Sequence, residues 1–392
     1  MNKMKLLLPI MALLCTLLSV SCNEKSRILG NGLIEVDLRE NPPVKKICLQ
    51  DIATIEYIPI VNDSNFIPRS NMLNISWNSD LMSAIGGADF EEILLFNKRG
   101  APVNKIVKQG QGPHEYTYAS IQSIIGGEVY NYDMSNGKML VYDIEGNFIR
   151  SFKCPDIGSL NIYNDSSFIC HHFAVNKVEP DYMPYYTIIS NKDGKELQRI
   201  DLPYSIDKPV QIQVVTEDSG GEKLIFSTFH YALIRRLDGS FTLNELSTDT
   251  VYRFSADKGL GPIMVRKPSV KEDKTVFLEY GLDTKDYIFM VKVSVDKKNP
   301  KNMFPSEQWV FDKTAQKMYE VEVINEDFPT DVRALNADVM YANSPNGTTT
   351  FRYRAYHLCE AYKEGKLYGK LKEIASTLSE EDNDVYVLVK FK

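Results

Sequence analysis

The chain has 392 residues and is acidic, with 45 Lys and Arg against 52 Asp and Glu and a formal net charge of −7. An acidic balance without a basic run argues against nucleic acid as a partner, because phosphate contacts need clustered Lys and Arg. The six cysteines include no Cys-x-x-Cys pair, so the sequence gives no support to a zinc site of the ribbon type.

The first 21 residues are predicted to be a secretory signal peptide of the lipoprotein type. Lys3 and Lys5 precede an apolar run over residues 6–20, which is shorter than the roughly 20 residues that a transmembrane helix needs. Ser21 and Cys22 follow this run directly, and Cys22 resembles the cysteine of a bacterial lipobox, although Ser19 stands where the strict pattern prefers Leu. We therefore expect lipid attachment at Cys22, a tether over residues 22–32 and a folded domain over residues 33–392.

The cysteines after residue 22 are expected to be mostly buried free thiols. Export would permit disulfides, and four cysteines allow three pairings, but a chain of this size does not need covalent staples. The four residues are Cys48, Cys154, Cys170 and Cys359.

Short strands separated by tight turns are predicted along most of the chain. Turns with Asn or Asp and a glycine contain Gly100, Gly146 and Gly194, which recur at intervals of about 46–48 residues, typical of propeller blades. We expect an all-β propeller of six blades of about 60 residues each, with seven or eight shorter blades as alternatives. The predicted strands are 93–96, 103–107, 129–132, 138–142, 148–152, 185–190, 195–202, 232–236, 251–254, 287–295, 308–311 and 317–323.

The segment 108–116 is rich in glycine but does not fit a phosphate-binding loop. Such a loop needs a Lys-Ser/Thr pair and a following helix, whereas this segment leads into another strand. The favoured interpretation is a tight connection in which Tyr116 packs inward. The alternative is a ligand-binding rim formed by Gln111, His114 and Glu115.

His171 and His172, with Glu179 and Asp181 nearby, are the one cluster that suggests metal or acid–base chemistry. Adjacent histidines on a strand point to opposite faces, so at most one should enter a site. A loop of exposed polar residues is the favoured interpretation, and His171 is kept as a ligand-binding candidate. His230 and His357 are isolated in the sequence and are interpreted as structural.

Tyrosine is dense over residues 182–186, and such rings can stack against sugars. Packing between blades also uses tyrosines on strands and accounts for most of them. Tyr182 is therefore a candidate for contacting a carbohydrate.

Near the C-terminal end, the sequence predicts helices as well as strands. Residues 355–363 and 367–378 place apolar side chains at helical spacing and predict a short helical insertion. Residues 385–391 predict a final strand. Because a propeller must close its sheet edges, the last blade is expected to receive a strand from the other end of the chain, with residues 33–38 as the candidate.

Four local matches make the chain resemble the six-bladed β-propeller lipoproteins of the bacterial cell envelope, related in fold to NHL and TolB-like propellers. They lie at 55–59, 110–116, 249–252 and 380–383. Two departures are His114, where the family usually has Gly, and Asp384, where it usually has Pro. The resemblance implies fold, export and ligand recognition, and it transfers no catalytic residue.

The leading functional hypothesis is an exported, membrane-tethered binding module of the cell envelope. Its anchor would be the lipid on Cys22, on the outer membrane, and its ligand an unidentified small molecule, glycan or peptide. One alternative is an NHL-like hydrolase or lyase with a divalent metal in the central channel, and another is a structural subunit of an envelope complex. No cofactor is predicted. No Gly-x-Ser-x-Gly elbow occurs, and no catalytic residue can be assigned.

Overall fold

The computed structural model describes residues 28–68, 76–78, 80–173, 182–217, 221, 223–227, 230, 232–331 and 348–392. The predicted signal peptide, Cys22, Glu179 and Asp181 lie outside these ranges, as does most of the tether. Within the described ranges, no helix has both the length and the apolar composition needed to cross a bilayer.

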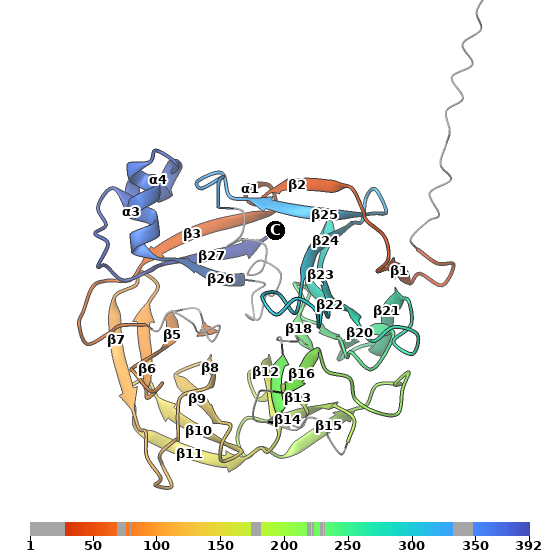
Figure 1. Ribbon diagram of the computed structural model, residues 1–392. Coiled ribbons are helices and arrows are strands. Elements are labelled where there is room, and N and C mark those ends of the chain that lie inside the picture. The colour runs from red at the N-terminus through yellow and green to blue at the C-terminus, as the bar shows by residue number, and fades with distance from the viewer. Residues whose placement is uncertain are drawn as a thin grey trace, which may run out of the picture.

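Six sheets are arranged as blades around one axis, which confirms the predicted six-bladed β-propeller (Figure 1). In blades 1 to 3 the strands follow one another in sequence order from the axis to the rim, whereas the outermost strand of each of the other three blades comes from the N-terminal part of the chain. Blade 1 contains β4 (Ser76–Trp77), β5 (Leu81–Gly86), β6 (Glu92–Asn97) and β7 (Pro102–Val107). Blade 2 contains β8 (Ile121–Ile125), β9 (Glu128–Asp133), β10 (Lys138–Asp143) and β11 (Phe148–Lys153). Blade 3 contains β12 (Ile157–Asn164), β13 (Ser167–His172), β14 (Tyr185–Ser190) and β15 (Glu196–Ile200).

The next two blades each carry an additional outer strand from the N-terminal part of the chain. Blade 4 contains β18 (Leu233–Arg235), β19 (Phe241–Leu243), β20 (Thr250–Ser255), β21 (Gly259–Lys267) and, parallel to β21, β1 (Ile34–Asp37). Blade 5 contains β22 (Val276–Asp283), β23 (Tyr287–Ser294), β24 (Ser306–Asp312), β25 (Lys317–Ile324) and, parallel to β25, β2 (Val44–Cys48). A separate two-stranded hairpin, β16 (Gln213–Glu217) and β17 (Lys223–Ser227), lies between blades 3 and 4 in the sequence.

Blade 6 closes the disc with strands from both ends of the chain. It contains β26 (Thr348–Tyr353), β27 (Val385–Phe391) and β3 (Ala53–Pro59), with β27 antiparallel to both neighbours. The prediction that residues 33–38 provide the closing strand is therefore wrong. Those residues form β1 on blade 4, because Val36 and Leu38 are buried in an apolar cluster between blades 4 and 5.

The buried apolar side chains explain why the blades stack into a disc. Within the described residues they form six clusters, and each cluster fills the space between two neighbouring blades. Middle strands such as β6 and β10 are buried on both faces and read as continuous apolar runs, whereas the outer strand β7 is mostly exposed or half-buried. The sequence predicted the ends of all three of these strands to within one residue.

The recurring glycines take up the turn conformation that their spacing predicted. Gly100, Gly146 and Gly194 all have positive φ, between 73° and 87°. At Gly100 the requirement is also steric, because a Cβ there would overlap the backbone carbonyl of Pro59. This glycine thus permits close contact between the β6–β7 turn of blade 1 and the end of β3 in blade 6.

The predicted helical insertion lies between β26 and β27 at the outside of blade 6 (Figure 1). It contains α3 (Ala355–Lys363) and α4 (Gly369–Ala375), whose buried residues Leu358 and Leu371 join the cluster between blades 5 and 6. A further short helix, α1 (Leu49–Ile52), connects β2 to β3. The four cysteines at positions 48, 154, 170 and 359 are free thiols, as expected.

Candidate functional site

The five residues predicted to contact a ligand lie at the same face of the disc. The inner strand of each blade begins on one face, called the front face, and ends on the other, called the back face. In blades 1 to 3 the fourth antiparallel strand ends at the front face, so the connections from these blades to the next one start there. Gln111, His114 and Glu115 are in the connection from β7 to β8, His171 is near the end of β13, and Tyr182 lies just before β14.

The glycine-rich connection is a tight structure with Tyr116 buried, as the favoured interpretation predicted. The Tyr116 hydroxyl donates to the carbonyl of Glu91 at 2.7 Å. The Glu115 carboxylate accepts from the backbone N–H of Gly112 at 2.8 Å, and a Cβ at Gly110 would overlap this carboxylate. Glu115 is therefore engaged within its own loop, whereas Gln111 is exposed at the surface.

The exposed His114 ring stacks on Phe148 of β11, with ring centroids 4.0 Å apart. Its backbone carbonyl accepts from the Tyr142 hydroxyl at 2.9 Å. The side chain therefore extends the apolar surface of blade 2 and is held in one orientation.

His171 and His172 point to opposite faces of their strand, which confirms the geometric expectation. Both are buried on β13, so the favoured interpretation of a loop of exposed polar residues is wrong for these two histidines. His171 pairs across the sheet with Tyr186, at a ring distance of 5.0 Å, and His172 pairs with Tyr185, at 4.7 Å. His172 Nε2 also lies 2.7 Å from the Thr187 hydroxyl. Burial, with a smaller effect of the neighbouring His171, lowers the pKa of His172 to about 4, so this ring is neutral at physiological pH.

Tyr182 belongs to an aromatic group at the front edge of blade 3. Its ring is 6.0 Å from that of Tyr185. Tyr185 is covered on one side by His172 and on the other by the Arg199 guanidinium, which lies 3.8 Å from the ring centroid. Both faces of Tyr185 are thus occupied by protein groups, which leaves Tyr182 as the ring of this pair on which a sugar would have to stack.

A buried acid–base cluster joins blades 3 and 4. His171 Nε2 forms an ion pair with Oε1 of Glu245, in the segment after β19, and the Tyr186 hydroxyl lies 3.1 Å from the same oxygen. All three side chains are buried. Burial raises the pKa of the Glu245 carboxyl, but His171 and His230 outweigh that effect and hold the pKa below its usual value.

A second pair continues this cluster into blade 5. His230 Nδ1 lies 2.7 Å and 2.8 Å from the two carboxylate oxygens of Glu279 on β22, and Nε2 lies 2.6 Å from the carbonyl oxygen of Asn244. Burial lowers the pKa of His230, but Glu279 and then Glu245 more than offset it, so the pKa stands above its usual value. His230 looks isolated in the sequence because its partner Glu279 is 49 positions away.

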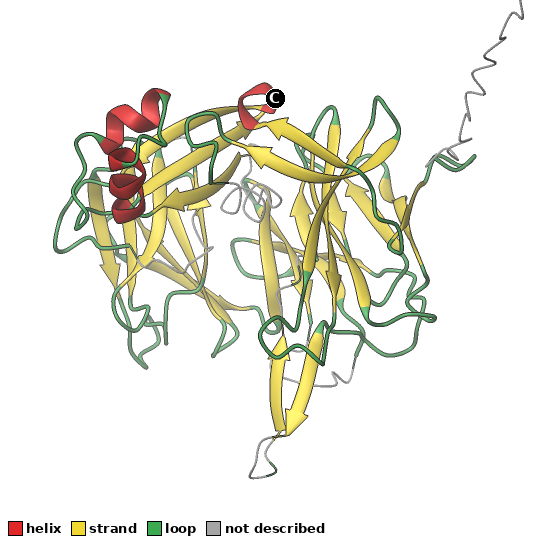
Figure 2. Cartoon of the chain, turned by 45° about the horizontal axis from the view of Figure 1, so that its top comes forward, coloured by secondary structure: helices red, strands yellow, loops and turns green. Residues whose placement is uncertain are grey.

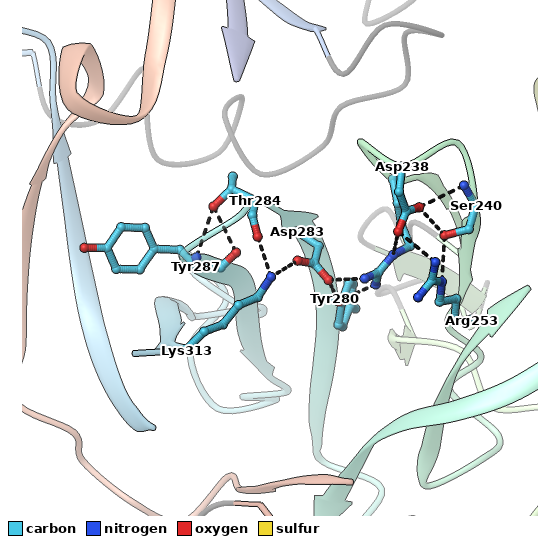
Figure 3. Close-up of polar contacts among 9 residues, drawn as sticks. Asp238, Ser240, Arg253, Tyr280, Asp283, Thr284, Tyr287 and Lys313 are labelled. Atoms are coloured by element: carbon cyan, nitrogen blue, oxygen red, sulfur yellow. Dashed lines mark hydrogen bonds and ion pairs between the residues drawn. The ribbon is translucent and has the colours of Figure 1, made fainter. Parts of the chain in front are cut away.

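At the back face, a different ionic network connects blades 4 and 5 (Figure 3). Asp283, at the end of β22, pairs with Arg236 of the β18–β19 turn and with Lys313, whose Nζ is 2.5 Å from Oδ1. The Tyr280 hydroxyl donates to the other Asp283 oxygen at 2.9 Å. The Asp283 carboxylate thus pairs with two cations, Arg236 of blade 4 and Lys313 of blade 5, and holds these two blades together.

The two clusters are better suited to holding blades together than to chemistry on a substrate. Among the described residues, no group of three or more His, Cys, Asp or Glu side chains is arranged to hold a metal ion. The hypothesis of a channel metal therefore finds no ligand set in those ranges. Glu245 and Asn244 border a cavity of about 10 Å³, which has room for about one water and is too small for a substrate.

Exposed apolar side chains gather instead on the hairpin β16–β17, which extends away from the disc (Figure 2). Val215, Leu224, Ile225 and Phe226 are between 41% and 48% exposed. Val215 and Ile225 form one cross-strand pair, and Leu224 and Phe226 lie on the opposite face of the hairpin. Among the described strands, only β16 pairs with β17.

One solved structure agrees with the fold described above. A protein from Bacteroides fragilis NCTC 9343, whose name describes it as exported, is similar at a TM-score of 0.58 and 14% identity over 92% of this chain and 99% of its own. A member of the DUF4221 family from Bacteroides vulgatus matches at a TM-score of 0.45 and 8% identity, over 87% of this chain and 97% of its own. The virginiamycin B lyase of Staphylococcus aureus matches at 0.32 and 10%, over 65% and 88%. The first likeness supports the fold alone, and the other two carry no argument about activity.

The fold and the contacts between blades define this protein as a six-bladed β-propeller. No curated protein matches its sequence. Residues 33–390 match the family described as a domain of unknown function, DUF4934, and the chain belongs to that family.

Proposed function

We propose that this protein is an exported, lipid-anchored propeller of the cell envelope, related to NHL and TolB-like propellers, that binds an extended polypeptide segment at its front face. The observation that carries the proposal is the hairpin β16–β17, which has exposed apolar side chains and in which the outer edge of β17 pairs with no other described strand. An isolated two-stranded hairpin is only marginally stable in water, so a binding partner would stabilise it. Strand addition to such an edge is a common mode of peptide recognition.

A peptide fits these surfaces better than a glycan. Carbohydrate recognition would need open aromatic faces, and both faces of Tyr185 are covered, which leaves Tyr182 as the one ring of this pair that could stack on a sugar. The strand β17, by contrast, offers backbone hydrogen-bonding groups with Leu224 and Phe226 on one face of the hairpin and Ile225 on the other. A partner strand with alternating apolar residues would bury these side chains.

Phage-displayed random peptides selected on the wild-type protein are expected to be enriched in extended, apolar sequences. Their affinity should fall by about tenfold or more in the double variant Leu224→Lys/Phe226→Lys, because central apolar contacts dominate such interfaces. Leu197→Lys on β15, at a side chain 56% exposed, is the matched control and should bind normally. Equal binding by all three proteins, or selective binding in a parallel glycan array with no peptide enriched, would contradict the proposal.

The lipid anchor is tested separately. Metabolic labelling with a fatty-acid analogue should mark the wild-type protein and not Cys22→Ala, because the thiol of residue 22 is the proposed attachment point. Fractionation should place the labelled protein with the outer membrane. Equal labelling of both proteins would remove the anchor from the proposal without affecting the peptide-binding part.

A further inference from the structure

His230 connects the hairpin to the body of the disc. It lies three residues after the last residue of β17 and three before the first residue of β18. Its two ring nitrogens contact groups of different blades, the Glu279 carboxylate of blade 5 and the Asn244 carbonyl of blade 4. At this side chain, the leg of the hairpin that leads into β18 is therefore tied to two blades.

Both contacts require the ring to be protonated at both nitrogens when Glu279 is ionised. A backbone carbonyl can only accept a hydrogen bond, so Nε2 must donate to Asn244. A carboxylate also only accepts, so Nδ1 must donate to Glu279 as well. A neutral imidazole has one N–H and would leave a nitrogen lone pair facing the Glu279 oxygens at 2.7 Å and 2.8 Å.

The charged groups around His230 favour the imidazolium. Glu279 faces it from β22, and Glu245 acts on it from the segment after β19. The Glu245 carboxylate is itself contacted by His171 of β13 and Tyr186 of β14. Without the charge on His230, the carboxylates of Glu245 and Glu279 would lose the cation that lies between their two blades.

The other leg of the hairpin is held by groups that do not titrate. The backbone N–H of Ser205 donates to the Ser247 carbonyl at 3.1 Å, and that of Val210 donates to the Ser247 hydroxyl at 2.8 Å. Ile212 and Val214 of this leg are buried. Among these hydrogen bonds of the two legs, those of His230 are the ones that depend on a proton.

We propose that protonated His230 anchors the β17 leg of the hairpin to blades 4 and 5, and that loss of the proton releases this leg. The consequence for ligand binding rests on the proposed peptide-binding function, whereas the anchoring itself does not. The raised pKa supports the direction of the effect. A group with a raised pKa stabilises the folded arrangement fully below its ordinary value of 6.5, and the stabilisation is lost as the pH rises through the higher folded value.

Hydrogen exchange of the hairpin amides, without any ligand, tests the anchor. In the wild-type protein the amides of residues 223–227, corrected for intrinsic exchange rates, should lose protection by about tenfold or more between about pH 6 and about pH 9. Amides of β6 in blade 1 should keep theirs. In the same samples, NMR of the His230 ring should show its titration at the pH where protection is lost.

Two variants and a control sharpen the result. Glu279→Gln keeps an acceptor but removes the negative charge, so the transition should move to lower pH. His230→Gln should give weak protection at every pH, and His357→Gln, at an exposed histidine on α3, should match the wild type. Protection that stays constant in the wild-type protein, or a His230 ring that does not titrate in this range, would overturn the proposal even where a variant fails to fold. Peptide binding plays no part in these readouts, so they are independent of the proposed function.

Discussion

A chain that ends at Glu381 is expected to lose its cooperative thermal unfolding transition. This truncation removes β27, the middle strand of blade 6, which pairs with both β26 and β3. Val385, Val387 and Val389 of β27 are fully buried. Burial of each such side chain contributes about 1.5–3 kcal/mol, and whole domains are stable by only about 5–15 kcal/mol. Differential scanning calorimetry or circular dichroism would measure the transition.

The matched control is a chain that begins at residue 39 and therefore lacks β1. This strand is only the outermost one of blade 4, so the disc can close without it. We expect a cooperative transition at a lower temperature, because Val36 and Leu38 no longer fill the cluster between blades 4 and 5. A wild-type transition in the first truncation would show that β27 and β3 do not close the disc, and loss of cooperativity in the control would show that closure depends on β1 as well.

The sequence predicts the bounds of single strands and helices well, but it does not predict which strands pair to close the disc. Strand β14 and helix α3 have the predicted bounds, because alternation, turn glycines and helical spacing are properties of neighbouring residues. The partner of a strand is not a local property. Pro59 pairs with Val385, more than 300 positions away, and no pattern around residues 33–38 distinguishes the edge of blade 4 from the gap in blade 6.

In the candidate site, too, the sequence predicts local geometry but not contacts between distant parts of the chain. The front-face positions of Gln111, His114, His171 and Tyr182 follow from the order of strands, and the opposite orientation of His171 and His172 follows from strand geometry. The groups that His171 and His230 contact come from other blades. A histidine that looks isolated in the sequence can therefore lie in an ionic cluster, because the propeller brings together residues that are tens of positions apart.

Replacement of Glu245 by Ala is expected to destabilise the protein by about 3–5 kcal/mol near neutral pH. Such losses are typical when one partner of a buried ion pair is removed and the other is left uncompensated. Here the loss would leave His171 and the Tyr186 hydroxyl without the carboxylate that both contact inside the protein. Equilibrium unfolding in urea would measure the difference. The surface pair of Lys46 and Glu322 provides the control, and Glu322→Ala should change stability by about 1 kcal/mol or less.

The pH dependence of the same variants identifies the cause of the loss. Because the folded pKa of Glu245 is lowered from its ordinary 4.5, its charge stabilises the protein above that value, and the stabilisation is lost as the pH falls through the folded pKa. Glu245→Gln keeps the shape and an oxygen that can accept from Tyr186, so its stability deficit relative to the wild type should shrink below about pH 4.5. A deficit of constant size across this range would assign the loss to packing and not to the charge of Glu245.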